Sequence, residues 1–99
     1  MSSWCYVVRP ARPELLTDPT ADERDAVGAH FAHLERLLAA GKLVFAGRSP
    51  DEEHAFGIVV LEASEEEARR ALEDDPAVVR GVMTAQLLPF RIALLRGRD

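Results

Sequence analysis

The chain has 99 residues, of which 47% are hydrophobic and 29% charged, and its formal net charge is −5 at pH 7. This balance is typical of one globular domain with a single core, and it argues against a disordered chain. The net negative charge disfavours nucleic acids and anionic membranes as partners. The sequence has one cysteine, no signal-peptide pattern at its start, and no apolar run of the roughly 20 residues that a membrane helix needs. We therefore expect a cytoplasmic protein in which residues 1–99 form a single domain.

Two capping boxes mark the starts of the predicted helices. Thr20 and Glu23 have the spacing at which a threonine and a glutamate cap each other's backbone amides, and Ser64 and Glu67 repeat it. Gly41 supplies the left-handed residue that ends the first helix. The second helix ends at Asp75-Pro76, because the residue before a proline is pushed out of the helical region.

The strands are predicted from short runs of aromatic and β-branched residues. In chain order we expect a strand at 4–8, a proline-containing loop at 10–20, a first helix, strands at 43–46 and 56–61 joined by a hairpin loop at 47–54, a second helix, a short helical turn at 76–80, and a strand at 84–95 with a bend at Pro89. The order is βαββαβ. It predicts the α+β ferredoxin-like fold, an antiparallel four-stranded sheet with both helices on one face.

The open face of that sheet is predicted to be apolar. Two helices cover only one face, so the other should carry polar residues. Instead, Ile58 and Val60 alternate with Val59 and Leu61, which makes the strand apolar on both faces. An open apolar face of this size would be a sticky surface. We therefore expect it to pack against a second copy in a homodimer, the alternative being a monomer with a partly apolar open face.

One histidine lies within the apolar arc of the first helix. The arc consists of Val27, Phe31, Leu34, Leu37 and Leu38. His30 falls inside it, where an imidazole without a hydrogen-bond partner would cost about 1–3 kcal/mol. Asp75 could supply that partner, and a His–Asp pair is a common proton-transferring base. Two alternatives stay open: His30 is a core histidine bonded to a backbone carbonyl, or Asp75 is only the helix cap before Pro76.

Other candidate site residues carry weaker signals. His33 falls at the edge of the arc and is expected to be solvated, and His54 lies in a polar loop. The spacing of these histidines and Cys5 matches no zinc motif, so no metal site is expected. No nucleotide-binding loop or RNA-recognition pattern is present, and we expect no cofactor. Cys5 is interpreted as a small buried hydrophobic residue.

Two runs of sequence carry a family resemblance. The first is HFAHLERLLAAGKL, from His30 to Leu43, continued by Ala46-Gly47; the second is DDPAVVRGV, from Asp74 to Val82, continued by Leu88-Pro89-Phe90. Together with the opening strand through Arg9-Pro10, they span nearly the whole chain. In their order and spacing they resemble the YciI-like (YCII) family.

The resemblance implies a dimeric α+β barrel and a pocket whose His–Asp pair is taken as the active site. Carried over by position, the pair is His30 and Asp75, rather than Asp74. Family members characterised as enzymes resemble dehydrochlorinases that act on chlorinated hydroxyquinol-type rings, and relatives of the fold include muconolactone isomerase. Where many relatives have Gly-Pro after the second strand, this chain has Gly47-Arg48, in a loop expected to border the pocket.

Three hypotheses follow for the function. In the first, the protein is a small cofactor-independent lyase or isomerase acting on an aromatic or lactone-like metabolite, with His30 as base and Asp75 fixing its tautomer. Substrate would be bound by Gly47, Arg9 and Arg48, the arginines offering positive charge to a developing enolate. In the second, the pocket is a non-catalytic binding or accessory module for a small acidic or aromatic ligand. In the third, His30 and Asp75 merely satisfy each other within the fold.

Overall fold

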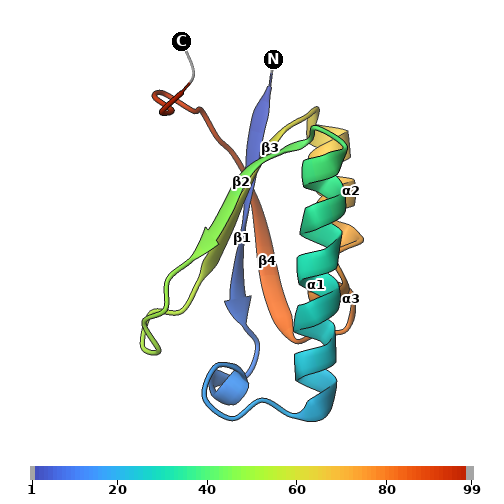
Figure 1. Ribbon diagram of the computed structural model, residues 1–99, viewed down its shortest axis with the longest axis vertical. Coiled ribbons are helices and arrows are strands. Elements are labelled where there is room, and N and C mark those ends of the chain that lie inside the picture. Colours follow the sequence, from blue (N-terminus) through green and yellow to red (C-terminus); the bar gives the residue numbers. More distant parts are fainter. Residues whose placement is uncertain (1, 98–99) are drawn as a thin grey trace.

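The computed structural model describes residues 2–97. Its elements are β1 (Ser3–Pro10), the 3-10 turn η1 (Pro13–Leu15), α1 (Ala21–Ala39), β2 (Leu43–Arg48), β3 (Gly57–Glu62), α2 (Glu65–Glu73), α3 (Pro76–Val79) and β4 (Met83–Pro89). The sheet has the order β2-β3-β1-β4 with every neighbouring pair antiparallel, and the helices lie together on one face of it (Figure 1). The predicted α+β ferredoxin-like fold is confirmed.

Both predicted capping boxes are present at the helix starts. The Thr20 hydroxyl accepts from the Glu23 amide at 3.0 Å, and the Glu23 carboxylate accepts from the Thr20 amide at 2.8 Å. Ser64 and Glu67 repeat both bonds at 3.1 Å. Beyond α1, Gly41 has φ +76°, as expected for the residue that ends a helix. Within the described residues, no helix is long and apolar enough to cross a membrane.

The core lies between the sheet and the helices. Directly opposed residues of neighbouring strands point to the same face of a sheet. The pairings therefore put one row, Ala46, Val59, Tyr6 and Leu87, across all four strands on a single face. Tyr6 and Val59 pack in one cluster with Leu34 of α1 and with alanines of α2, so this row is the face that the helices cover.

The other face of the sheet carries a second apolar row. It consists of Phe45, Val60, Cys5 and Leu88, one residue from each strand. Cys5 and Val60 at its centre are buried, whereas Phe45 and Leu88 at its ends are exposed. The interpretation of Cys5 as a small buried hydrophobic residue is confirmed, and burial raises the pKa of its thiol. The predicted apolar character of this face, called the open face below, is likewise observed.

The last strand is shorter than predicted. β4 ends at Pro89, and residues 90–95 leave the sheet (Figure 1). The last backbone bond to the neighbouring strand runs from the Phe90 amide to the Ser3 carbonyl at 3.2 Å, because β1 itself begins at Ser3. Alternation of apolar residues continues beyond that point without a strand to pair with, and Leu94 is 95% exposed.

The hairpin loop also begins later than predicted. Gly47 and Arg48, assigned to the loop, continue β2 and pair with Ile58 and Gly57 of β3. A glycine followed by a charged residue is typical of loops, so the sequence alone places the start of the loop too early. The loop therefore spans residues 49–56, closed by a bond from the Ser49 amide to the Phe56 carbonyl at 2.8 Å.

The predicted apolar arc of α1 is wrong at its margin. Ala26 and Leu34 are buried, but Phe31 and Leu38 are 62% and 58% exposed. Successive helical residues are about 100° apart, so a helix that turns positions 26, 30 and 34 toward the sheet moves position 31 away from it. His30 thus lies nearer the centre of the buried side than the arc implied.

The close packing of β3 against β1 yields a stability prediction. A Cβ added at Gly57 would lie 2.9 Å from the Val8 Cγ2 and 3.5 Å from the Gly47 carbonyl oxygen, so Gly57→Ala is expected to destabilise the fold by about 1–3 kcal/mol. Gly28→Ala is the matched control. In α1 its Cβ meets nothing within 4 Å, and the change should stabilise by about 0.5–1 kcal/mol. Urea unfolding of both variants measures the difference, and equal stabilities would contradict the packing.

Candidate active site

A cavity of about 250 Å³ opens on the helix-covered side of the sheet. It lies between α1, η1, the last residues of β1 and β2, and the first residues of β3. Most of its walls are apolar, with Leu34, Phe56 and Met83 among them. The polar side chains in its lining are His30, Arg48 and Ser49. His30 and Arg48, the latter exposed, thus both belong to the lining of a mostly apolar cavity.

His30 lies between this cavity and a buried carboxylate. Its Nδ1 is 2.8 Å from Oδ1 and 2.7 Å from Oδ2 of Asp75. The His30 side chain is 12% exposed, and Asp75 is 0% exposed. The two residues are 45 positions apart, and they meet because α1 and the junction of α2 with α3 lie on the same sheet face. The predicted contact is confirmed.

Asp75 accepts hydrogen bonds from two further donors. The Tyr6 hydroxyl donates to Oδ2 at 2.8 Å, and the Ala77 amide donates to Oδ1 at 3.0 Å. Asp75 is thus the N-cap of α3 and the partner of His30 at once, so these interpretations do not compete. Burial raises the pKa of this carboxyl, but the bonds from His30, Tyr6 and Ala77 outweigh it and hold the pKa below its usual value.

The carboxylate determines which ring nitrogen of His30 can act on a solute. A carboxylate only accepts hydrogen bonds, so in the neutral ring Nδ1 carries the hydrogen and Nε2 carries the lone pair. His30 lines the cavity, whereas Asp75 lies behind the ring and is fully buried. The arrangement provides one unprotonated nitrogen to a solute and a negative charge behind it, which stabilises the ring once it takes up a proton.

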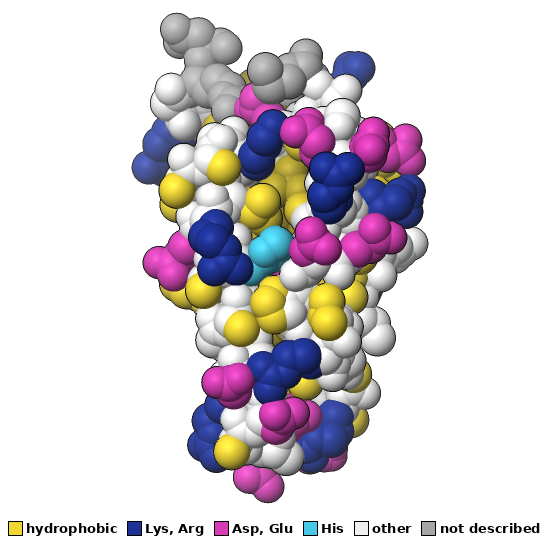
Figure 2. Space-filling model, turned by 90° about the vertical axis from the view of Figure 1, so that its right-hand side faces the viewer, with side chains coloured by type: hydrophobic (Ala, Val, Ile, Leu, Met, Phe, Trp, Pro, Cys, Tyr) yellow, Lys and Arg dark blue, Asp and Glu magenta, His cyan; other side chains and the backbone are white. Residues whose placement is uncertain are grey.

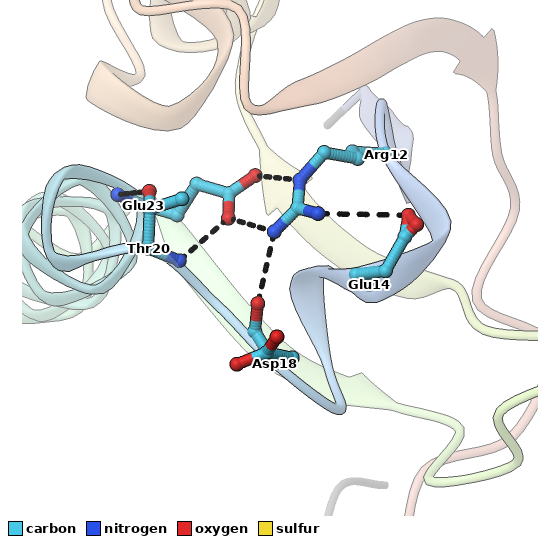
Figure 3. A network of polar contacts seen from close by, with 5 residues as sticks. All are labelled: Arg12, Glu14, Asp18, Thr20 and Glu23. Atoms are coloured by element: carbon cyan, nitrogen blue, oxygen red, sulfur yellow. Dashed lines mark hydrogen bonds and ion pairs between the residues drawn. The ribbon is translucent and has the colours of Figure 1, made fainter.

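An ion-pair network fixes the loop that forms one wall of the cavity. Arg12 donates to the Glu23 carboxylate at 2.6 and 3.0 Å and to the Asp18 carbonyl at 2.9 Å (Figure 3). The Arg12 guanidinium, with the capping bond from Thr20, lowers the pKa of Glu23 to about 2. The network ties residues 11–20 to the start of α1. Leu15 and Leu16 of this loop line the cavity.

The predicted substrate-binding residues are separated by the sheet. Gly47 and Arg48 line the cavity with His30. Arg9 does not, because it lies between Val8 and Pro10, which both line the cavity, and residues in a strand alternate between faces. Arg9 is exposed and pairs with Thr84 on the open face.

The remaining histidines lie outside the cavity lining. The prediction that His33 is solvated is wrong: it is half-buried, and its Nε2 is 2.9 Å from the Ala71 carbonyl oxygen, which links α1 to α2. His54 is exposed, and its Nδ1 is 3.0 Å from an Asp51 carboxylate oxygen. Over residues 2–97, no group of three or more His, Cys, Asp or Glu side chains could hold a metal ion.

Sequence reasoning missed Tyr6 and Arg12. Tyr6 is 69 positions from Asp75, and the sequence pattern predicts it only as a strand residue. A signal was present, since a tyrosine at the centre of a buried strand must find a partner for its hydroxyl. Arg12 lies directly before the 3-10 turn that begins at Pro13, in the loop predicted at 10–20, and it belongs to no motif in the sequence.

The outer surface of the helices is a mixture of charges. Figure 2 looks onto the helices and shows Lys and Arg side chains interspersed with Asp and Glu. Three ion pairs on this side are Lys42–Glu67, Arg69–Glu65 and Arg70–Glu66. A surface of alternating sign has no continuous basic stripe of the kind that tracks a phosphate backbone.

Comparison with known proteins identifies relatives of this chain. A family model described as the YCII-related domain matches residues 5–91. No curated protein matches. Among solved structures, the 5-chloro-2-hydroxyhydroquinone dehydrochlorinase of Burkholderia phenoliruptrix AC1100, in complex with 2,5-dihydroxybenzoquinone, aligns with a TM-score of 0.63 and 24% identity, over 89% of this chain and 93% of that one.

Two further solved structures have the same fold at lower identity. An uncharacterized protein from Thermotoga maritima aligns with a TM-score of 0.59 and 11% identity, over 90% of this chain and 95% of that one. A cofactor-independent oxygenase from Streptomyces nogalater aligns with a TM-score of 0.56 and 14% identity, over 99% of this chain and 100% of that one. At these identities the likeness concerns the fold alone.

The buried carboxylate makes stability depend on pH. Because the folded pKa of Asp75 lies below its unfolded value, its ionisation stabilises the fold at neutral pH, and this contribution is lost as pH falls below about 4, through the folded pKa. Asp75→Asn should therefore cost about 2–4 kcal/mol at pH 7, with a smaller difference from wild type at pH 3. Urea unfolding at both pH values measures the difference in free energy of unfolding.

Asp74→Asn is the control, because Asp74 is an exposed neighbour. It should change stability by less than about 0.5 kcal/mol, and an equal loss in the two variants would contradict the assignment of Asp75 as the buried, ionised partner of His30.

Proposed function

The chain belongs to the YCII-related domain family, and we propose that it is a small cofactor-independent enzyme in which His30 acts as a general base. The reaction class is elimination, as in a dehydrochlorinase, or isomerisation, and the substrate is a small aromatic or lactone-like metabolite. The observation that carries the proposal is the position of His30, in the lining of a cavity with its Nδ1 bonded to the buried Asp75.

The proposed chemistry begins with one proton transfer, which is followed in an elimination by loss of a leaving group and in an isomerisation by return of the proton to another substrate carbon. His30 Nε2 takes a proton from a substrate carbon, and the electron pair of that C–H bond forms an enolate or a new double bond. In an elimination, the carbon–chlorine bond then breaks and chloride leaves with its electron pair. Asp75 stabilises the imidazolium until the His30 ring releases the proton, to solvent after an elimination or to the substrate in an isomerisation. A positioned base of this kind contributes roughly 10²–10⁴ in rate.

Arg48 is the proposed site for the negative charge that develops on the substrate. Arg48 is among the residues that line the cavity, and the walls of the cavity are mostly apolar. A cation attracts a developing oxyanion more strongly where water is excluded than in bulk solvent. Gly47 beside it alternates with Arg48 along β2, so Gly47 is proposed to contact substrate through its backbone.

The size of the cavity favours a single ring. At about 250 Å³ it lies below the roughly 300–1,000 Å³ that is usual for small-molecule sites. The solved dehydrochlorinase with the same fold is named for a one-ring chlorinated substrate and holds a one-ring quinone. Oxygenated one-ring compounds are therefore the first class to test.

The direct test measures turnover in wild type and in His30→Gln. Wild type is incubated with 5-chloro-2-hydroxyhydroquinone and with a panel of halophenols and lactones, and product is followed by absorbance and chloride release. Loss of the base should lower turnover by at least about 10²-fold while the fold is retained. His33→Gln, one helical turn away and outside the cavity lining, should keep its turnover. Unchanged turnover in a folded His30→Gln protein would refute the base, and binding without product across the panel would favour an accessory binding module.

The protein is further proposed to act as a homodimer that packs through its open face. The row Phe45, Val60, Cys5 and Leu88 is apolar across all four strands, and both of its ends are exposed. The helix side carries charges of both signs among its exposed apolar side chains (Figure 2), whereas the row on the open face is apolar throughout, and this favours the open face for packing against a second copy.

Sedimentation equilibrium tests the dimer. Wild type should have about twice the 10.9 kDa mass of one chain. Leu88→Lys places a charge in the proposed interface and should give monomers, because an unpaired buried charge is costly. Leu38→Lys, at an exposed leucine of α1, should leave the mass unchanged. A monomeric wild type, or the same mass in both variants, would be incompatible with this interface.

A further inference from the structure

Packing of the core does not by itself require the hydroxyl group of Tyr6. Tyr6 is fully buried within the cluster between the sheet and the helices, where a phenylalanine ring would fill nearly the same volume. Its hydroxyl donates to Asp75 Oδ2 at 2.8 Å, the same oxygen that lies 2.7 Å from His30 Nδ1. Three groups are thus connected by hydrogen bonds from the cavity inward: imidazole, carboxylate and phenol.

We propose that Tyr6 is a positioning residue that moderates the base strength of His30 by sharing the charge of Asp75. The inference rests on the proposed function, since base strength matters only if His30 moves protons. A buried carboxylate bonded to an imidazole raises the proton affinity of the ring. A second donor on the carboxylate draws part of its negative charge away, so the imidazolium is stabilised less. A base is most effective when it titrates near the working pH.

Tyr6 can act on His30 only through Asp75, because its hydroxyl bonds to the carboxylate rather than to the ring. Burial, followed by the charge and the hydrogen bond of Asp75, raises the pKa of Tyr6, so the phenol keeps its proton and remains a donor. It is therefore not a relay that passes protons onward. Its effect is a fixed dipole aimed at one carboxylate oxygen.

The other groups around His30 do not duplicate this effect. From β2, Arg48 lines the same cavity, and on α1 itself His33 lies one turn away with its Nε2 at the Ala71 carbonyl. The loop after β1 and the start of β4 contribute Leu15 and Met83 to the cavity, which carry no charge. Tyr6 is thus the neutral donor that sets how much of the Asp75 charge the ring experiences.

The test measures the reactivity of His30 and requires no substrate. Diethyl pyrocarbonate acylates the unprotonated nitrogen of a histidine ring, so the pH profile of its reaction reports when the ring loses its proton. The profile for His30 is followed by peptide mass analysis in wild type and in Tyr6→Phe, with exposed His54 as the internal reference. Loss of the hydroxyl should displace the His30 profile to higher pH by about 0.5 unit, roughly the effect of one hydrogen bond shared across the pair. The His54 profile should not move.

A second perturbation acts in the opposite direction. The chain has one tyrosine, so growth on 3-fluorotyrosine alters Tyr6 alone. The fluorinated phenol is more acidic and donates more strongly, so the His30 profile should be displaced to lower pH. Cys5→Ala is the matched control: it removes a buried side chain next to Tyr6 on the opposite sheet face and should leave the profile in place.

The outcomes separate this inference from the proposed reaction. A His30 profile that is unchanged, or displaced to lower pH, in folded Tyr6→Phe would overturn the role of Tyr6. If that variant does not fold, the fluorotyrosine protein decides, and an unmoved profile there overturns it equally. If wild type turns over substrate but the His30 profile does not move in Tyr6→Phe, the role of Tyr6 is refuted and the proposed reaction stands. If the profile is displaced but no substrate is turned over, the proposed reaction is refuted and the effect of Tyr6 on His30 stands.

Discussion

The buried carboxylate of Asp75 is the constraint on which this structure depends. Removing a carboxylate from water is costly unless donors replace the lost hydration. Here three donors do so, and they come from three different elements: His30 on α1, Tyr6 on β1 and Ala77 on α3. The carboxylate can remain charged only while all three elements keep their positions. The same contacts therefore fix α1 against the sheet and orient the imidazole.

The geometry also determines which chemistry the cavity can support. Solvent and solute meet the His30 ring first, with the acid behind it and the phenol deeper still. A carboxylate in the cavity itself would repel the anion that forms when a carbon loses a proton. In the proposed reaction, a carboxylate behind the ring would instead stabilise the imidazolium, and Arg48 belongs to the same cavity lining as the ring. The separation of the two charges by the ring suits proton abstraction from carbon.

What the sequence predicted well was local. The capping boxes at Thr20 and Ser64 and the Asp75-Pro76 break are encoded within a few residues, and they place His30 and Asp75 on elements of the same layer. What it predicted poorly depends on partners far along the chain. The apolar alternation after Pro89 looks like a strand, yet no neighbouring strand extends far enough to pair with it. The Tyr6 hydroxyl finds its acceptor 69 positions away, and no spacing rule reports such a contact.

Of the two arginines predicted to bind substrate, Arg48 lines the cavity and Arg9 does not, and the alternation of residues in their strands explains the difference. Alternation in β1 turns Val8 toward the cavity and Arg9 to the open face, so one residue of register separates Arg9 from the cavity lining that contains His30. In β2, continuation of the strand through Arg48 pairs it with Gly57, on the face that the helices cover. A Cβ at Gly57 would lie 2.9 Å from the Val8 Cγ2, so a larger residue there would require Val8 to shift. Val8 and Gly57 both line the cavity, so this close contact joins the packing of the sheet to the shape of the site.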